Sequence, residues 1–143
     1  MSIFDSLHIS ASGLSLERLK LDTISTNIAN VNTTRTEEGG PYQKKSIVFE
    51  EALKQSGQAF SVGNGQKSFG VRATEITADE TELREYQPTH PDADEEGYVL
   101  LSNVNMADEM VEMMKTLRAY DANITSLEAG KDLLKQALTI SAK

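Results

Sequence analysis

A regular apolar stripe in the last third of the chain constrains its fold more than any other feature. The apolar residues step alternately by four and three positions, and only Lys131 interrupts them. A repeat of 3.5 residues is typical of a helix that packs in a left-handed coiled coil. The stripe consists of Met106, Met110, Met113, Leu117, Tyr120, Ile124, Leu127, Leu134 and Leu138.

Polar residues at the start of this stripe indicate where the helix begins. Asn105 is a plausible N-cap, and Asp108 and Glu109 would lie in the first turn, where carboxylates favour the helix dipole. The pattern predicts a helix over residues 105–140, roughly 54 Å long at 1.5 Å per residue. Such a helix needs a partner surface to cover its apolar side.

The first thirty residues predict a second, shorter helix. One set of positions with seven-residue spacing, here called a column, holds Ile24 and Val31. Its earlier positions are polar, because Ser10 and Glu17 occupy them. The other column has a strict seven-residue spacing and consists of Leu7, Leu14, Leu21 and Ile28. Together the columns predict an amphipathic helix of about residues 3–30. Because a long segment joins the two helices, they most simply run antiparallel.

The middle of the chain favours short strands and loops. Residues 42–49, 71–77 and 98–101 are β-prone, whereas residues 57–70 and 87–97 are rich in turn-forming residues. The fold class expected is therefore mainly α with a small β insert, the terminal helices pairing as an antiparallel coiled coil.

This fold class divides the chain into three segments. We expect an N-terminal helix in residues 1–32, a loop-rich β insert in 33–102 and a C-terminal helix in 103–143. The two terminal segments together would form one inner coiled-coil domain.

Composition limits the functions available to this chain. Only 38% of its 143 residues are hydrophobic and 6% aromatic, a thin supply for a large core. The net charge of -8 argues against nonspecific binding to nucleic acid or to anionic membranes. With no cysteine, disulfides and thiolate chemistry are excluded. The sequence has no Sec-type signal and no apolar run of membrane-spanning length, so we expect a cytosolic protein or one exported by another route.

The acidic stretch of residues 92–103 fits a calcium-binding loop only in part. Asp92, Asp94, Glu96 and Gly97 occupy suitable positions of an EF-hand frame. The closing position, which needs a bidentate glutamate, holds Asn103. An acidic turn before a strand explains these residues better, and we expect no metal site.

Two other motifs fail in the same way. A phosphate-binding loop requires Gly-Lys-Ser in succession, but Gln66 separates Gly65 from Lys67. The histidines His8 and His90 lie far apart, so nothing indicates a catalytic dyad. We therefore expect no catalytic residue and no cofactor, and hence no enzyme.

The segment of residues 22–40 ends the first helix with an unusual number of asparagines and threonines. Neutral amides and hydroxyls both donate and accept hydrogen bonds, so they can be buried between subunits without the cost of a charge. The alternative is a helix end leading into a loop. Both can hold, with Asn27 and Asn30 in a contact and Asn32 to Thr34 in the exit.

Residues 16–45 resemble the N-terminal signature of bacterial flagellar axial proteins. The segments 34–45, 90–99, 103–114 and 118–123 resemble the proximal-rod members of that family in particular. Thr26 stands where an asparagine is usual, and residues 56–85 match no motif of the family. The positions that match the signature are Arg18, Leu21, Asp22, Ile24, Ser25, Asn27, Ile28, Ala29, Asn30, Asn32 and Thr33.

The resemblance implies a noncatalytic structural subunit of the basal-body rod, the drive shaft that crosses the periplasm. Its partners would be other copies of itself, other rod proteins and the flagellar type III export apparatus, which needs no cleaved signal peptide. The competing hypothesis is a cytosolic acidic coiled-coil adaptor or export chaperone. The residues expected at subunit interfaces are Leu7, Leu14, Leu21, Ile24, Ile28, Asn27, Asn30, Asn32, Met106, Met110, Met113, Leu117, Tyr120, Asn123, Ile124, Leu127, Leu134 and Leu138.

Overall fold

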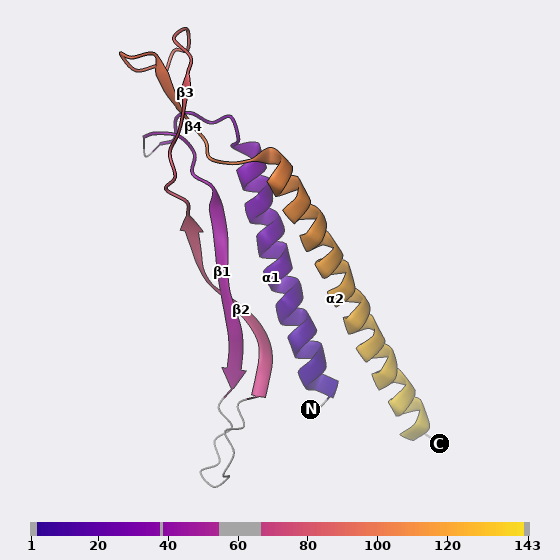
Figure 1. Cartoon of the computed structure of the whole chain (residues 1–143). Coiled ribbons are helices and arrows are strands. Elements are labelled where there is room, and N and C mark those ends of the chain that lie inside the picture. The colour runs from indigo at the N-terminus through magenta and orange to yellow at the C-terminus, as the bar shows by residue number, and fades with distance from the viewer. Residues whose placement is uncertain (1–2, 38, 55–66, 142–143) are drawn as a thin grey trace. The chain divides into compact units, whose positions relative to one another are not determined.

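A computed structural model describes residues 3–37, 39–54 and 67–141 of the chain (Figure 1). Within these residues two helices enclose four strands in sequence order. The elements are α1 (Ile3–Ala29), β1 (Lys45–Lys54), β2 (Lys67–Ala78), β3 (Leu83–Tyr86), β4 (Tyr98–Leu101) and α2 (Met106–Ser141). This order confirms the expected pair of terminal helices around a small β insert.

Both helices agree with the ranges that the apolar columns predict. The prediction of Asn105 as N-cap is confirmed, because its Oδ1 accepts a hydrogen bond from Ala107 N at 3.0 Å. At the end of α1, Asn30 Nδ2 donates to Thr26 O at 2.9 Å, and its Oδ1 accepts from Thr33 Oγ1 at 3.2 Å. These side-chain hydrogen bonds join the last turn of the helix to the residues that follow it.

The longer strands, β1 and β2, form a two-stranded sheet. Arg72 pairs with Glu50 at 2.5 Å, and Thr74 Oγ1 donates to Val48 O at 3.3 Å. Residue numbers rise along β2 as they fall along β1, so the strands are antiparallel. The predicted strand 71–77 lies within β2, whereas β1 begins three residues later than the predicted stretch 42–49 and extends to Lys54.

The prediction of a loop over residues 57–70 was wrong at its end, because residues 67–70 belong to β2. Turn-prone composition suggested a loop there, but Gly70 serves instead to let the strand approach α1. A Cβ at Gly70 would lie 3.3 Å from the Cα of Ile9. The remainder of this predicted loop, residues 57–66, lies outside the described residues.

The second sheet pairs β3 with β4 in antiparallel register, with Leu83 opposite Leu101 and Tyr86 opposite Tyr98. Strand β4 coincides with the predicted stretch 98–101, whereas β3 was not predicted. All four side chains of β3 are exposed, so the strand lacks the alternation that reveals a half-buried strand. The rings of Tyr86 and Tyr98 pack edge to face with centroids 5.4 Å apart.

The chain divides into two compact units, each of which uses part of both helices and of the β1–β2 sheet. The first unit takes the described residues of 1–19, 48–75 and 116–143. The second takes those of 20–47 and 76–115.

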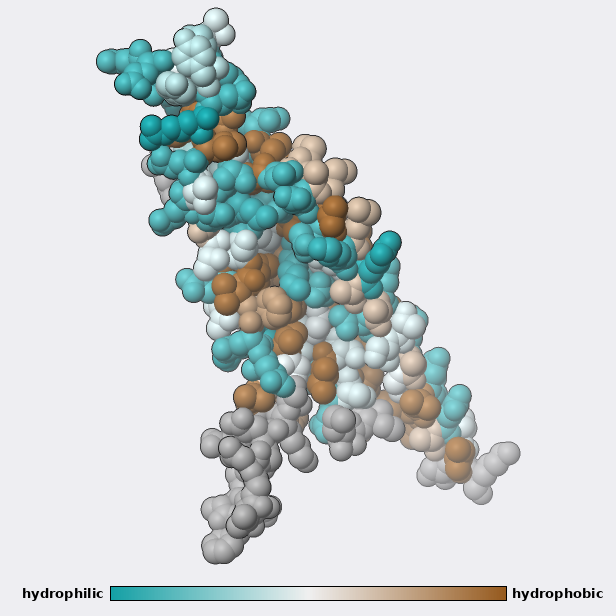
Figure 2. All heavy atoms as spheres, in the orientation of Figure 1, coloured by the Kyte–Doolittle hydropathy of each residue, from teal (hydrophilic) through white to brown (hydrophobic). Residues whose placement is uncertain are grey.

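The apolar core is small, as the low aromatic content leads one to expect. Its fully buried hydrophobic residues are Leu16, Ile24, Tyr42, Val99 and Val104. Polar side chains are buried in similar number, which is unusual because such groups need internal partners. Conversely, hydrophobic residues reach the surface in small patches among polar ones (Figure 2).

Candidate functional site

The side chain of Asn27 in α1 lies at the centre of a buried polar cluster in the second unit. It is 1% exposed. Its Nδ2 donates to Lys45 O at 2.9 Å and to Glu109 Oε2 at 3.0 Å. Its Oδ1 accepts from Lys45 N and from the hydroxyl of Tyr42, both at 3.0 Å. The amide thus uses both of its donor hydrogens and both acceptor positions.

Glu109 brings a carboxylate into the same cluster from the first turn of α2. It is 2% exposed, and its other oxygen, Oε1, lies 2.7 Å from Lys44 Nζ. Burial of a carboxylate is costly unless both its charge and its oxygens have partners. Burial raises the pKa of the neighbouring Tyr42 hydroxyl, and the negative charge of Glu109 raises it further. Tyr42 therefore stays a neutral hydrogen-bond donor to Asn27.

Backbone hydrogen bonds extend this cluster toward the start of α2. Lys44 N donates to Asn103 Oδ1 at 2.7 Å, and Asn103 Nδ2 donates to Asp79 O at 2.8 Å. Asp79 N in turn donates to Lys44 O at 2.8 Å. Hydrogen bonds from Thr81 to the Asp79 carboxylate lower the pKa of Asp79. The segments that enter β1 and leave β2 are thereby joined to the one that enters α2.

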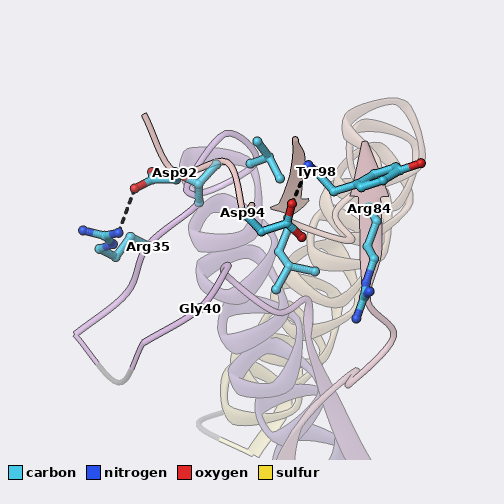
Figure 3. Close-up of a pocket in the computed structure, with 9 residues that line it drawn as sticks. Arg35, Gly40, Arg84, Asp92, Asp94 and Tyr98 are labelled. Carbon is cyan, nitrogen blue, oxygen red and sulfur yellow. Dashed lines mark hydrogen bonds and ion pairs between the residues drawn. The ribbon is translucent and has the colours of Figure 1, made fainter. Parts of the chain in front are cut away.

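A second feature of this unit is a pocket of about 270 Å³ beside β4 (Figure 3). Asp92 on its wall pairs with Arg35 at 2.9 Å and accepts from Thr34 Oγ1 at 2.9 Å. Asp94 Oδ1 accepts from the backbone N of Tyr98 at 2.8 Å. The Asp92 and Asp94 carboxylates of the calcium-like sequence thus hold a turn and a loop in place. Among the residues that the structure describes, no group of three or more potential ligands could hold a metal ion.

In the first unit, small and polar residues line the contact between α1 and α2. Ser10 Oγ lies 3.3 Å from Ser126 Oγ. A Cβ at Gly13 would lie 2.9 Å from Asn123 Nδ2. A Cβ at Gly130 would lie 2.9 Å from Leu7 Cδ2, so both glycines permit a close approach of the two helices.

The residues predicted at subunit interfaces fall into three groups by exposure. Ile24 and Asn27 are fully buried within the chain. Asn32 is exposed, and so are the apolar side chains of Met106, Met110, Leu117 and Leu138. The remaining members, all half-buried, are Leu7, Leu14, Leu21, Ile28, Asn30, Met113, Tyr120, Asn123, Ile124, Leu127 and Leu134.

Sequence reasoning missed the buried polar positions of α2. Glu109 was assigned only to the helix dipole, and Thr116 was given no role, yet they are 2% and 5% exposed. They begin a seven-residue column that continues through Asn123 to Gly130. The regular spacing was visible in the sequence, but its polar and small members do not resemble an apolar seam.

The two histidines bind local backbone groups. His8 Nδ1 lies 3.3 Å from Phe69 O in the first unit, and His90 Nδ1 accepts from Asp92 N at 3.1 Å in the second. Of the described helices, neither combines the length and apolar character needed to cross a membrane.

Comparisons of the sequence with known proteins match both ends of the chain and, for relatives, nearly its whole length. The family model for flagella basal body rod proteins matches residues 7–35. The model for the C-terminal part of flagellar basal body rod FlgEFG proteins matches residues 95–140. Both ends of the chain, including Asn27 and Glu109, therefore carry the features of a flagellar rod protein.

Relatives over the full length define the family more closely. The flagellar basal-body rod protein FlgC of Borreliella burgdorferi is 40% identical, and the alignment covers 98% of each chain. FlgC of Bacillus subtilis is 38% identical, over 98% of this chain and 99% of the relative. FlgC of Yersinia enterocolitica is 33% identical over 98% of each chain. The chain belongs to the FlgC family of flagellar basal-body rod proteins, and it is a structural rod subunit of the flagellar basal body rather than an enzyme.

Proposed function

We propose that this chain builds the rod by pairing α1 with α2 as an antiparallel coiled coil and by presenting other apolar residues to neighbouring subunits. The proposal rests on the alignment of α1 with α2 in the first unit. Leu7 lies against Gly130, Ser10 against Ser126 and Gly13 against Asn123. As residue numbers rise along α1, they fall by a similar amount along α2, as antiparallel helices require.

In this proposal, residues 1–32 and 103–143 form the inner coiled-coil domain, and residues 33–102 form the outer part of the subunit. The partners are further copies of the chain and other rod proteins. The subunit passes through the flagellar type III export apparatus without a cleaved signal peptide and becomes part of the rod in the periplasm. Membership of the FlgC family supports these assignments.

Exposed apolar side chains on α2 support contact with neighbouring subunits. Met106, Met110 and Leu117 are 46%, 54% and 44% exposed, and Leu138 is 70% exposed. Each square ångström of apolar surface removed from water contributes about 25 cal/mol. Repetition of such contacts over many subunits would stabilise a shaft that transmits torque. The half-buried members of the predicted set would hold the helices together inside each subunit.

An engineered disulfide tests the antiparallel pairing. The sequence has no cysteine, so a chain carrying Ser10→Cys and Ser126→Cys has one possible intramolecular disulfide. The two Oγ atoms are 3.3 Å apart, and we expect the disulfide to form in isolated basal bodies. In the control, Ser10→Cys is combined with Ala137→Cys, eleven residues further along α2 and so about 16 Å away along the helix. Equal disulfide yields in the two variants would contradict the pairing.

A charge on the exposed stripe tests the contact between subunits. We expect Leu117→Asp to block incorporation into rods, since a carboxylate would be buried against the neighbour without a partner. Leu21→Asp, at a half-buried position of α1, should also prevent assembly. Ala122→Asp places the same charge at an exposed position on another face of α2 and should be tolerated. Normal rods and motility with Leu117→Asp would rule out this interface.

A further inference from the structure

We infer that Asn27 acts inside the subunit as a positioning residue that joins the end of α1 to the start of β1 and to the first turn of α2. Asn27 then does not contact a neighbouring subunit, although its place in the asparagine-rich signature suggested that role. This inference concerns the second unit alone and does not depend on the proposed helix contacts in the first. It rests on the four hydrogen bonds of the Asn27 amide.

The amide binds Lys45 as a neighbouring strand would. Nδ2 donates to Lys45 O and Oδ1 accepts from Lys45 N, so one side chain satisfies both backbone groups of the first residue of β1. These groups are buried or half-buried, and leaving them without partners would destabilise the junction. The Asn27 side chain therefore fixes where β1 begins relative to α1.

The remaining donor and acceptor positions reach two other residues. Nδ2 donates its second hydrogen to the buried carboxylate of Glu109, and Oδ1 accepts from the buried hydroxyl of Tyr42. An aspartate has no hydrogen to give to either Lys45 O or Glu109 Oε2. A leucine would leave all four partners unsatisfied. Among residues of this size, only an amide can serve this site.

Glu109 adds a requirement for helix register. Its carboxylate is buried and satisfied by Asn27 Nδ2 on one oxygen and by Lys44 Nζ on the other. A shift of α2 by one turn relative to α1 would remove the carboxylate from the Asn27 amide and leave its charge with fewer partners. Buried polar residues between helices specify register in this way. Asn27 and Glu109 thus define one alignment of the two helices in this unit.

The other asparagines of the signature have separate roles. Asn30 bonds to Thr26 O and Thr33 Oγ1 at the end of the helix. Asn32 is exposed and remains the member of the three that is available to a neighbour. Because Asn32 can meet a neighbour, the matched control for Asn27→Asp is Gln43→Glu, which makes the same change of amide to carboxylate at an exposed position outside the buried cluster.

The test compares four variants in a strain whose own copy of the gene has been deleted. Asn27→Asp replaces the donor NH2 by an oxygen that faces Lys45 O and Glu109 Oε2, and we expect it to abolish motility and rod assembly. Glu109→Gln retains an acceptor for Asn27 but turns an NH2 toward Lys44 Nζ, so it should assemble fewer rods than the wild type. The double variant Asn27→Asp with Glu109→Gln restores one hydrogen bond, since the new glutamine amide donates to the aspartate while its oxygen accepts from Lys44. It should recover motility in part, and Gln43→Glu should swim normally.

Each outcome decides for or against the inference. Failure of Asn27→Asp together with recovery in the double variant supports a direct pair between Asn27 and Glu109 inside the subunit. If Asn27→Asp swims as well as Gln43→Glu, the cluster does not position the helices. If the double variant assembles no more rods than Asn27→Asp alone, the function of Asn27 does not pass through Glu109. A contact with a neighbouring subunit would give this last result.

Discussion

Replacement of Gly70 by alanine should disrupt the first unit, because β2 passes very close to α1 at this residue. Gly70 has a φ of 108°, a backbone conformation that side chains with a Cβ rarely adopt. An added methyl group would also overlap Ser12 Oγ. That hydroxyl cannot move freely, since it donates to Ile9 O at 2.7 Å and accepts from Val71 N at 3.2 Å.

Two contributions set the size of the effect. The backbone conformation costs a residue other than glycine about 1–3 kcal/mol. Displacement of the Ser12 hydroxyl loses two hydrogen bonds, each worth about 1 kcal/mol. We therefore expect Gly70→Ala to lower the free energy of unfolding by about 3–5 kcal/mol. Small domains are stable by only about 5–15 kcal/mol, so the loss should also impair rod assembly.

The assay is urea unfolding of the purified chain, followed by circular dichroism, with motility of the complemented strain as a second measurement. Gly39→Ala is the control for backbone strain, because Gly39 has a φ of 88° but no atom within 4 Å of an added Cβ. It should lose only about 1–3 kcal/mol. Combining Gly70→Ala with Ser12→Ala removes the overlapping hydroxyl and should cost less than the two single changes added together. Equal losses from Gly70→Ala and Gly39→Ala would refute the close approach to α1.

Two further predictions concern the second unit and the start of α2. Because the pKa of Tyr42 is raised in the fold, its contribution to stability is complete below the ordinary value of 10.0 and is lost as pH rises through the folded value. Urea midpoints should thus fall in alkali, and less steeply for Tyr42→Phe; equal slopes would contradict the shift. Asn105→Ala should lower the free energy of unfolding by about 1 kcal/mol, whereas Asn105→Ser, which retains a cap, should not. Equal midpoints for these two variants would show that the cap contributes nothing.

The sequence predicted the helices well because their patterns are local and repeated. Seven-residue columns are visible over the whole length of each helix, and the N-cap of α2 is a single residue at its boundary. Strand β4 was predicted from a short apolar run. Strand β3 could not be, because all four of its side chains are exposed and only the pairing with β4 makes it a strand.

The candidate site was harder to predict because its contacts join distant parts of the chain. Asn27 was recognised as a residue that belongs in a buried place, but its partners lie 18 and 82 residues away. Nothing in the local sequence shows that Glu109, which suits a helix dipole, would instead be buried against Lys44. The sequence could supply the type of chemistry, a neutral amide able to donate and accept, but not the groups that it would bind.

The small and polar column on α2 explains why the apolar stripe is left partly exposed. In the first unit the column of Thr116, Asn123 and Gly130 is buried or half-buried, and Gly13 and Leu7 of α1 lie against its last two members. Because α2 turns this column toward α1, it cannot also bury every apolar residue of the stripe, which extends to one side of the column. Leu117, one position after Thr116, is accordingly 44% exposed, while Thr116 is 5% exposed. A chain built only to form a stable monomer would gain by exchanging these positions, so the observed order favours a subunit that completes its apolar contacts on assembly.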